Sequence, residues 1–233
     1  MASVLAQDPS LFDYHVIDGG SSDDTVDVVR RMAPQVDVLS EPDAGVYDAI
    51  NKGIARSTGR FFLVLGAGDV LRPGILARVA DRLRAAPPHS IVYGNVHWVS
   101  LNLTYDGLFT KRKLTLRCIC HQAMFIDRTL VDLFGPYDLR YPLSADWHFN
   151  IRCFGDPRVG VHYIDELIAD YEGGGISYTG SDSRFQADLP CLIRTSFGTR
   201  YFLLLMAHRA YRRISGIRLR GIKSRLHRMI KRS

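Results

Sequence analysis

The sequence lacks the features that mark membrane-spanning, secreted and zinc-binding proteins. No run approaches the roughly twenty apolar residues that a membrane-spanning helix needs, and no charged N-terminal region precedes an apolar run, as it does in a signal peptide. The four cysteines form no C-x-x-C pair, which disfavours a structural zinc site. We therefore expect a cytoplasmic protein whose cysteines are free thiols in a reducing compartment.

Acidic residues are missing from the C-terminal part of the chain. Twelve of the 30 Lys and Arg residues follow Asp188, whereas none of the 24 Asp and Glu residues does. Residues 1–188 therefore carry a net charge of −6, although the whole chain of 233 residues carries +6. This division predicts a globular domain in residues 1–188 and a basic tail in residues 189–233.

The basic tail also contains apolar residues at helical spacing. Ile222, Leu226 and Ile230 would share one face of a helix, with arginines around them. Such a basic amphipathic helix is typical of a segment that lies on an anionic membrane surface. Nucleic-acid binding is disfavoured because the tail has no base-stacking aromatic residue beyond Tyr211. A solvated basic face is the remaining alternative.

The chain does contain the helix and strand patterns of an α/β domain. Apolar residues recur at helical spacing in residues 46–57, and Gly59 suits the left-handed position after that helix. The apolar run at residues 61–65 predicts a strand buried on both faces. Gly66, Gly68 and Asp69 follow it, at the carboxyl end of the strand, where ligands bind in open α/β sheets. A metal-bound polyanion fits there, and a Gly-rich turn with a solvated Asp is the alternative.

Three blocks of sequence make the chain resemble a known enzyme family. They are SEPDAGVYDAINKGIARSTGRFFLVLGAGDV at residues 40–70, VIDGGSSD at 16–23, and HQ at 121–122 followed by ADW at 145–147. In this order they resemble the nucleotide-sugar-binding core of family 2 glycosyltransferases. The resemblance covers residues 3–180 and implies the GT-A fold, a mostly parallel sheet flanked by helices. Residues 119–154 resemble the branch of the family that adds sugars in phenolic-glycolipid assembly.

The resemblance implies which residues bind the sugar nucleotide. Asp18 occupies the position that contacts the nucleobase, although the same residue could merely begin a turn. Asp43, Asn51 and Lys52 match positions near the nucleotide. A lysine close to the diphosphate would offset charge on the leaving group, whereas a solvated helix position is the alternative for Lys52.

Asp69 is the residue that the resemblance assigns to a metal ion. The family motif is Asp-x-Asp or a near variant, whereas this chain reads Gly66-Ala67-Gly68-Asp69 and keeps only the last carboxylate. One carboxylate can still hold Mg²⁺ or Mn²⁺ together with substrate phosphates and water. We therefore expect a metal-dependent enzyme with a reduced set of protein ligands.

The acceptor side is implied by the blocks at His121 and Asp146. His121, Gln122 and Trp147 match positions near the acceptor, and Asp146 matches the catalytic base. For Asp146 the alternative is a capping role in the first turn of a helix. A base would remove the proton of the attacking hydroxyl, and the resemblance implies direct displacement with inversion at the anomeric carbon.

These observations predict an inverting glycosyltransferase of cell-envelope glycolipid synthesis. Its donor would be a nucleotide-diphosphate sugar, its acceptor a lipid-linked or glycan hydroxyl, and its tail would bind the inner face of the cell membrane. Family members normally begin with a strand and turn that precede the position of Ser3, and we expect a misassigned or trimmed start to account for their absence. The alternative is a donor-blind homologue that acts as an accessory subunit of a partner transferase. A dinucleotide dehydrogenase is disfavoured because no G-x-G-x-x-G follows a predicted strand.

Overall fold

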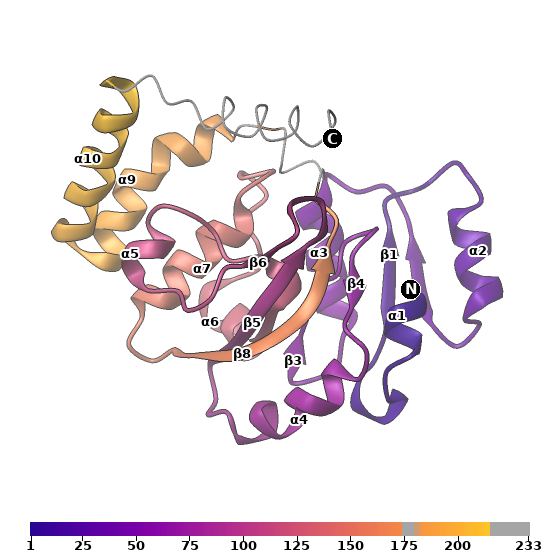
Figure 1. The fold of residues 1–233 in the computed structure, drawn as a ribbon. Helices are drawn as coiled ribbons and strands as arrows, with labels where there is room; N and C mark the ends of the chain where they lie inside the picture. The colour runs from indigo at the N-terminus through magenta and orange to yellow at the C-terminus, as the bar shows by residue number, and fades with distance from the viewer. Residues whose placement is uncertain (174–179, 181, 215–233) are drawn as a thin grey trace.

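The computed structural model describes residues 1–173, 180 and 182–214 (Figure 1). Within this part of the chain the α-helices are α1 (Ala2–Leu5), α2 (Thr25–Met32), α3 (Val46–Arg56), α4 (Ile75–Ala85), α5 (Lys111–Leu114), α6 (Thr129–Phe134), α7 (Ala145–Gly155), α9 (Ser183–Phe197) and α10 (Thr199–Ile214). The strands are β1 (His15–Asp18), β2 (Asp37–Ser40), β3 (Phe61–Phe62), β4 (Val70–Leu71), β5 (Ser90–Trp98), β6 (Leu103–Tyr105), β7 (Met124–Asp127) and β8 (Gly160–Tyr171). Single 3₁₀ turns lie at Pro9–Leu11, Val99–Leu101 and His121–Ala123.

The strands form two sheets. β1 and β2 pair in parallel as a two-stranded sheet, and the larger sheet has the order β3-β7-β5-β8-β4, with β6 added to β5. In the larger sheet β5 and β8 are parallel, whereas β3–β7, β5–β7, β5–β6 and β4–β8 are antiparallel. The α/β architecture is therefore as predicted, but the sheet is mixed where a mostly parallel one was expected. A short turn joins β5 to β6, and such turns return the chain antiparallel.

The core lies on both faces of the larger sheet. Alternate residues of β5 point to opposite sides, so Ile91 and Tyr93 belong to one apolar cluster and Val92 and Val96 to the other. Residues of α7 and α9 complete the first cluster, and residues of α4 complete the second. This two-sided burial explains the continuous apolar run Ile91-Val92-Tyr93 in β5.

Residues 61–65 pack on both faces as predicted, although only Phe61–Phe62 is paired as a strand. Phe62 and Val64 contact the first cluster, while Phe61, Leu63 and Leu65 contact the second. The segment then turns through Gly66 toward Asp69 and β4.

The α9–α10 hairpin shows that the packed fold extends past residue 188. α9 buries Phe185, Leu189, Ile193 and Phe197, and Leu205 of α10 is buried in the same cluster. The domain boundary predicted at residues 188 and 189 therefore falls inside a packed helix. The predicted apolar positions Ile222, Leu226 and Ile230 lie outside the described residues.

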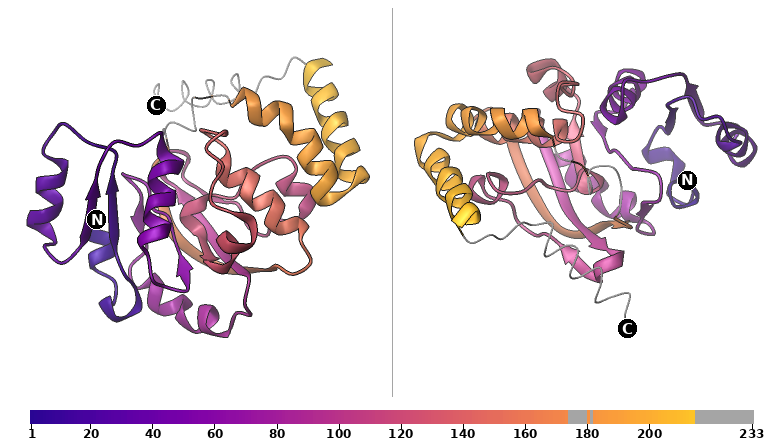
Figure 2. Two further views of the ribbon diagram at one scale, coloured as in Figure 1. Left: turned by 180° about the vertical axis from the view of Figure 1, so that it is seen from behind. Right: turned by 90° about the horizontal axis from the view of Figure 1, so that it is seen from above.

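The two sheets and the hairpin occupy different ends of the molecule. The β1–β2 sheet with α2 lies at one end and the α9–α10 hairpin at the other, with the larger sheet between them (Figures 1 and 2). No helix of the described residues combines the length and the apolar composition needed to cross a membrane.

Candidate active site

Asp18 is the last residue of β1, and Asp43, which follows β2, approaches the backbone at Gly19, the next residue. The Asp18 carboxylate accepts hydrogen bonds from the backbone amides of Gly20 and Ser21 at 3.1 and 3.0 Å, and from the hydroxyl groups of Ser21 and Ser40. These hydroxyl groups lower the pKa of Asp18 to about 2, so it stays ionised. A β-carbon on Gly19 would lie 2.4 Å from Asp43 Oδ2, so a side chain at position 19 would displace the Asp43 carboxylate. The structure thus brings two of the predicted donor-binding residues together.

Asn51 and Lys52, on α3, are both engaged by other parts of the protein. The Asn51 amide donates to the Tyr137 carbonyl oxygen and accepts from the Tyr137 amide, both at 2.9 Å. The Lys52 ammonium group donates to the Pro42 carbonyl oxygen at 2.9 Å and forms ion pairs with Glu41 and Asp48. Lys52 therefore holds the segment that leads into Asp43, and Asn51 ties α3 to the turn before α7.

Asp69 lies in the turn before β4 with its carboxylate almost buried, at 8% exposure. Its Oδ2 accepts from the Gln122 side-chain amide at 2.7 Å and from the Gly66 amide at 3.2 Å. Burial raises the pKa of Asp69 above its usual value. Gln122 is thus hydrogen-bonded to Asp69, although the resemblance assigns Gln122 to the acceptor side and Asp69 to the donor side.

The protein groups around Asp69 would not hold a cation on their own. Among the described residues there is no cluster of three or more His, Cys, Asp or Glu side chains with metal-site geometry. Asp69 supplies one carboxylate, which fits Mg²⁺ or Mn²⁺ only if the substrate phosphates and water complete the coordination. Its place in a glycine-containing turn, with Gly68 at φ +94, suits a ligand that approaches the backbone.

Asp146 is the second carboxylate of the site, in the first turn of α7. Its Oδ1 accepts from the Tyr47 hydroxyl and from the Trp147 amide, both at 2.7 Å. Its Oδ2 lies 3.6 Å from His121 Nδ1 and 3.7 Å from Cys118 Sγ. The structure therefore places Asp146 beside His121, two residues that the resemblance assigns to the acceptor side, and adds Tyr47, which sequence reasoning missed.

Trp147 does not face the same groups as Asp146. Its indole nitrogen donates to the Leu114 carbonyl oxygen at 2.7 Å, and its ring packs on Phe185 with centroids 5.2 Å apart. These contacts make Trp147 a link between α5, α7 and α9. Trp147 is thus anchored in the packing of these helices, whereas the resemblance assigns it to the acceptor side.

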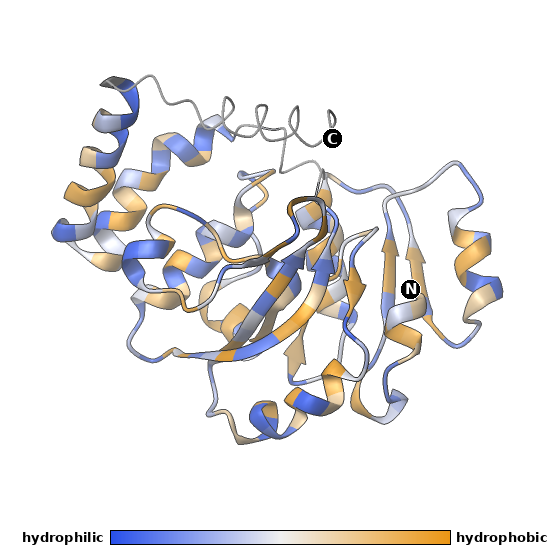
Figure 3. Ribbon diagram, in the orientation of Figure 1, coloured by the Kyte–Doolittle hydropathy of each residue, from blue (hydrophilic) through white to orange (hydrophobic). Residues whose placement is uncertain are grey.

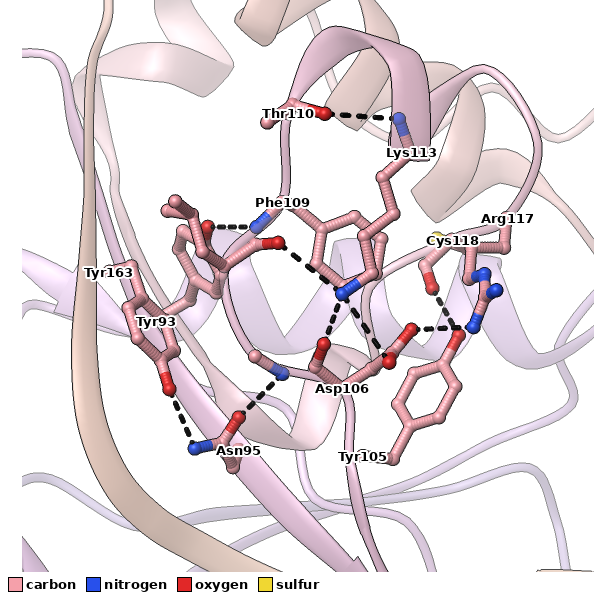
Figure 4. Close-up of polar contacts among 12 residues, drawn as sticks. Tyr93, Asn95, Tyr105, Asp106, Phe109, Thr110, Lys113, Arg117, Cys118 and Tyr163 are labelled. Atoms are coloured by element: carbon pink, nitrogen blue, oxygen red, sulfur yellow. Dashed lines mark hydrogen bonds and ion pairs between the residues drawn. The ribbon is translucent and has the colours of Figure 1, made fainter.

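Residues 106–118 form a loop that is held to β5 by hydrogen bonds (Figure 4). The Gly107 amide donates to the Asn95 side chain at 2.8 Å and the Phe109 amide donates to the Tyr93 hydroxyl at 2.8 Å, so the loop is attached to β5. In Figure 4 the Lys113 side chain reaches back to Asp106, and its ammonium group also lies 4.3 Å from the centroid of the Phe109 ring.

The same loop continues to the cysteine that contacts Asp146. Arg117 forms an ion pair with Asp106 at 2.8 Å, and the Tyr105 hydroxyl donates to the Cys118 carbonyl oxygen at 2.9 Å. Cys118 Sγ in turn lies beside Asp146. The loop is thus fixed by hydrogen bonds and ion pairs, and its last residue, Cys118, lies beside the Asp146 carboxylate.

Comparisons with known proteins agree with this geometry. Residues 1–131 match the family model described as glycosyl transferase family 2. A protein of Mycobacterium tuberculosis (strain ATCC 25618 / H37Rv) named PGL/p-HBAD biosynthesis glycosyltransferase is 40% identical over 211 residues, which cover 88% of this chain and 82% of that protein. The predicted resemblance to the phenolic-glycolipid branch is therefore confirmed.

Solved structures show the same fold at low sequence identity. TarS of S. aureus aligns with a TM-score of 0.65 at 15% identity, over 94% of this chain and 41% of TarS. A structure of TarS residues 1–349 in complex with UDP-GlcNAc aligns with a TM-score of 0.62, over 84% of this chain and 60% of that one. The predicted GT-A fold is confirmed, and the chain is a glycosyltransferase that belongs to glycosyl transferase family 2.

Proposed function

We propose that this glycosyltransferase moves a sugar from a nucleotide-diphosphate donor to a hydroxyl group by direct displacement with inversion. The observation that carries the proposal is the single carboxylate of Asp146, which faces His121 and is fixed by a hydrogen bond from Tyr47. The acceptor oxygen forms the new bond to the anomeric carbon as its proton passes to Asp146. The bond to the diphosphate breaks, and the diphosphate leaves with the electron pair.

The donor would lie along the groups at the ends of β1, β2 and residues 61–65. Asp18, Asp43 and the Asp69 turn follow these elements in the chain, and the TarS complex with UDP-GlcNAc supports a sugar nucleotide for a protein of this fold. Asp69 would hold a divalent cation against the diphosphate. Such a cation supplies positive charge to the leaving group when it is bound.

The donor proposal is tested by thermal unfolding with a panel of UDP-, GDP- and dTDP-hexoses in the presence of Mg²⁺. A ligand that binds only the folded state at a hundredfold excess over its Kd stabilises the protein by about 2.7 kcal/mol, which raises the Tm of a chain of this size by roughly 5–10 °C. We expect one nucleotide series to produce this shift, and Mg²⁺ alone to produce none. A Tm that is unchanged by every donor would favour the donor-blind accessory subunit.

The acceptor is proposed to be lipid-linked. The mycobacterial relative is named for PGL/p-HBAD biosynthesis, and the basic C-terminal part of this chain suits an anionic membrane surface. Helix α10 adds an apolar surface, because Leu203, Met206 and Tyr211 are 58%, 42% and 62% exposed on it. Figure 3 shows these helical turns alternating between hydrophobic and hydrophilic residues. An anionic bilayer would accept both the apolar side chains and the arginines.

Membrane attachment is tested by co-sedimentation with phosphatidylglycerol and phosphatidylcholine vesicles. We expect binding to the anionic vesicles only, weakened at high salt because exposed charges are screened. The double substitution Leu203→Gln and Met206→Gln, or removal of residues 215–233, should reduce binding severalfold. Leu139→Gln, which changes an exposed leucine elsewhere, is the matched control. Equal binding to both vesicle types, or to neither, would defeat the attachment.

A further inference from the structure

One face of α3 is bonded to the helix that carries Asp146. The Tyr47 hydroxyl donates to Asp146 Oδ1 at 2.7 Å, and Tyr47 is only 6% exposed. This hydrogen bond joins residues that are 99 positions apart in the chain. Because Tyr47 lies in the first turn of α3, the position of that helix determines where one oxygen of the carboxylate lies.

Asn51, one helical turn after Tyr47, supports the Tyr47–Asp146 hydrogen bond through Tyr137. Its side-chain amide makes two reciprocal 2.9 Å hydrogen bonds with the backbone of Tyr137. The Tyr137 ring packs between Tyr47, at 5.5 Å, and Phe149 of α7, at 5.3 Å between centroids. Residues four apart share a helix face, so Tyr47 and Asn51 together clamp α3 to α7.

The clamp leaves the two oxygens of Asp146 with different surroundings. Oδ1 accepts from both the Tyr47 hydroxyl and the Trp147 amide at 2.7 Å. Oδ2 accepts only a weak hydrogen bond from the Cys118 thiol at 3.7 Å and lies 3.6 Å from His121 Nδ1. A proton acceptor needs a lone pair that is not already bonded to a strong donor. Oδ2 is therefore the oxygen suited to take a proton from an acceptor hydroxyl.

We propose that Tyr47 and Asn51 are positioning residues for the base: Tyr47 orients the Asp146 carboxylate so that Oδ2 faces the acceptor, and Asn51 holds Tyr47 and α7 in register. The proposal rests on the proposed role of Asp146. It removes Asn51 from the expected nucleotide contacts and places the segment YDAIN, at residues 47–51, between the donor and the base.

The other titratable groups around Asp146 are Cys118, Cys120, His121 and Tyr137. Burial and the Asp146 charge raise the pKa values of Tyr47, Cys118 and Tyr137 well above their usual ranges, and that of Cys120 to about 12. The two tyrosines and the two cysteines are therefore neutral at pH 7. Tyr47 keeps its proton and stays a hydrogen-bond donor throughout the working pH range.

The variant that tests the proposal is Tyr47→Phe, which removes the hydroxyl and keeps the buried ring. We expect kcat to fall about tenfold, because a hydrogen bond to a charged group is lost, with the KM of the donor unchanged. The acid limb of the kcat–pH profile should move to higher pH, since the hydrogen bond that Tyr47 donates favours the ionised carboxylate. A merely structural tyrosine would lower the Tm without moving this limb.

Tyr141→Phe is the matched control. The Tyr141 hydroxyl donates to Asp188 at 2.9 Å, and Tyr141 is as buried as Tyr47. The control removes an equivalent tyrosine–aspartate bond and should leave the pH profile unchanged. If Tyr47→Phe does not fold, site-specific 3-fluorotyrosine at position 47 is used, a stronger donor of nearly the same shape. It should move the acid limb downward.

A double substitution separates this proposal from the role of Asp146 itself. In the Asp146→Asn background Tyr47→Phe should lower kcat no further, because both act through one carboxylate. Asn51→Ala should lower kcat with little change in donor KM, and a large rise in donor KM at full kcat would return Asn51 to the nucleotide.

The proposal is overturned if Asp146→Asn is inactive while Tyr47→Phe has the kcat and pH profile of the wild type. Near-normal turnover of Asp146→Asn would instead remove the base on which the proposal rests.

Discussion

Asp69→Asn should abolish turnover, and the wild-type enzyme should lose its activity when Mg²⁺ and Mn²⁺ are chelated. We expect a fall of about a hundredfold or more, the usual effect of losing a group that stabilises developing charge. The substitution removes a negative ligand, yet the Asn oxygen can still accept the Gln122 amide that lies 2.7 Å from Asp69 Oδ2. Nucleoside diphosphate release, measured against Mg²⁺ concentration, reports the effect.

Two controls separate loss of the cation from loss of the fold. The Tm of Asp69→Asn without donor should stay close to that of the wild type, because the hydrogen bond to Gln122 survives. Asp165→Asn changes an aspartate that is bonded to Asn95 and Tyr163, distant from the Asp69 turn in the chain, and should keep its metal dependence. Full wild-type activity in excess EDTA would contradict the assignment of Asp69 as a metal ligand. Backbone and cationic groups would then have to stabilise the diphosphate.

The sequence predicted well those parts of the fold that depend on local patterns. The helix expected at residues 46–57 is α3 (Val46–Arg56), because its apolar residues repeat at the period of a helix. Gly59 was wrongly expected to be left-handed. α3 ends on Ser57 in an extended conformation, and the Ser57 amide and hydroxyl bond to the carbonyl oxygens of Gly53 and Ile54. Two of the last four helical carbonyl groups are thereby satisfied without a glycine after the helix.

Strand direction and helix boundaries near the C-terminus could not be predicted in the same way. Composition shows that β5 and β7 are buried but not that they run antiparallel, since direction depends on how connections cross the sheet. The charge count placed a boundary at residue 188. The apolar repeat of Leu189, Ile193 and Phe197 continues α9 through that point, and burial of this repeat outweighs the change in surface charge.

Individual site residues could be predicted from the sequence only where they lie in a motif of the family. His121 and Asp146 do meet, but Trp147 points elsewhere, because neighbouring residues of an α-helix are rotated by about 100°. Tyr47 lies in the block at residues 40–70, yet an aromatic residue in an amphipathic helix is normally interpreted as part of the hydrophobic core. Its bond to Asp146 depends on the packing of α3 against α7, which no local pattern encodes.

Asp146→Asn is expected to keep the fold and donor binding while turnover falls by a hundredfold or more, as is typical when a general base is removed. The Asn oxygen can still accept the Tyr47 hydroxyl, so the geometry around position 146 is retained. The asparagine cannot take up a proton from the acceptor hydroxyl. Asp188→Asn alters another aspartate that accepts a tyrosine hydroxyl, and should have near-normal turnover.

The comparison of wild type with Asp146→Asn tests the account most directly. Donor-dependent thermal stabilisation and nucleoside diphosphate release are measured on both proteins, with the best donor of the nucleotide panel and the best acceptor from a panel of alkyl and aryl glycosides. We predict equal stabilisation by the donor and at least a hundredfold lower turnover in the variant. Turnover close to the wild-type rate, with the donor bound equally well, would contradict the account and leave Asp146 a structural role in the first turn of α7.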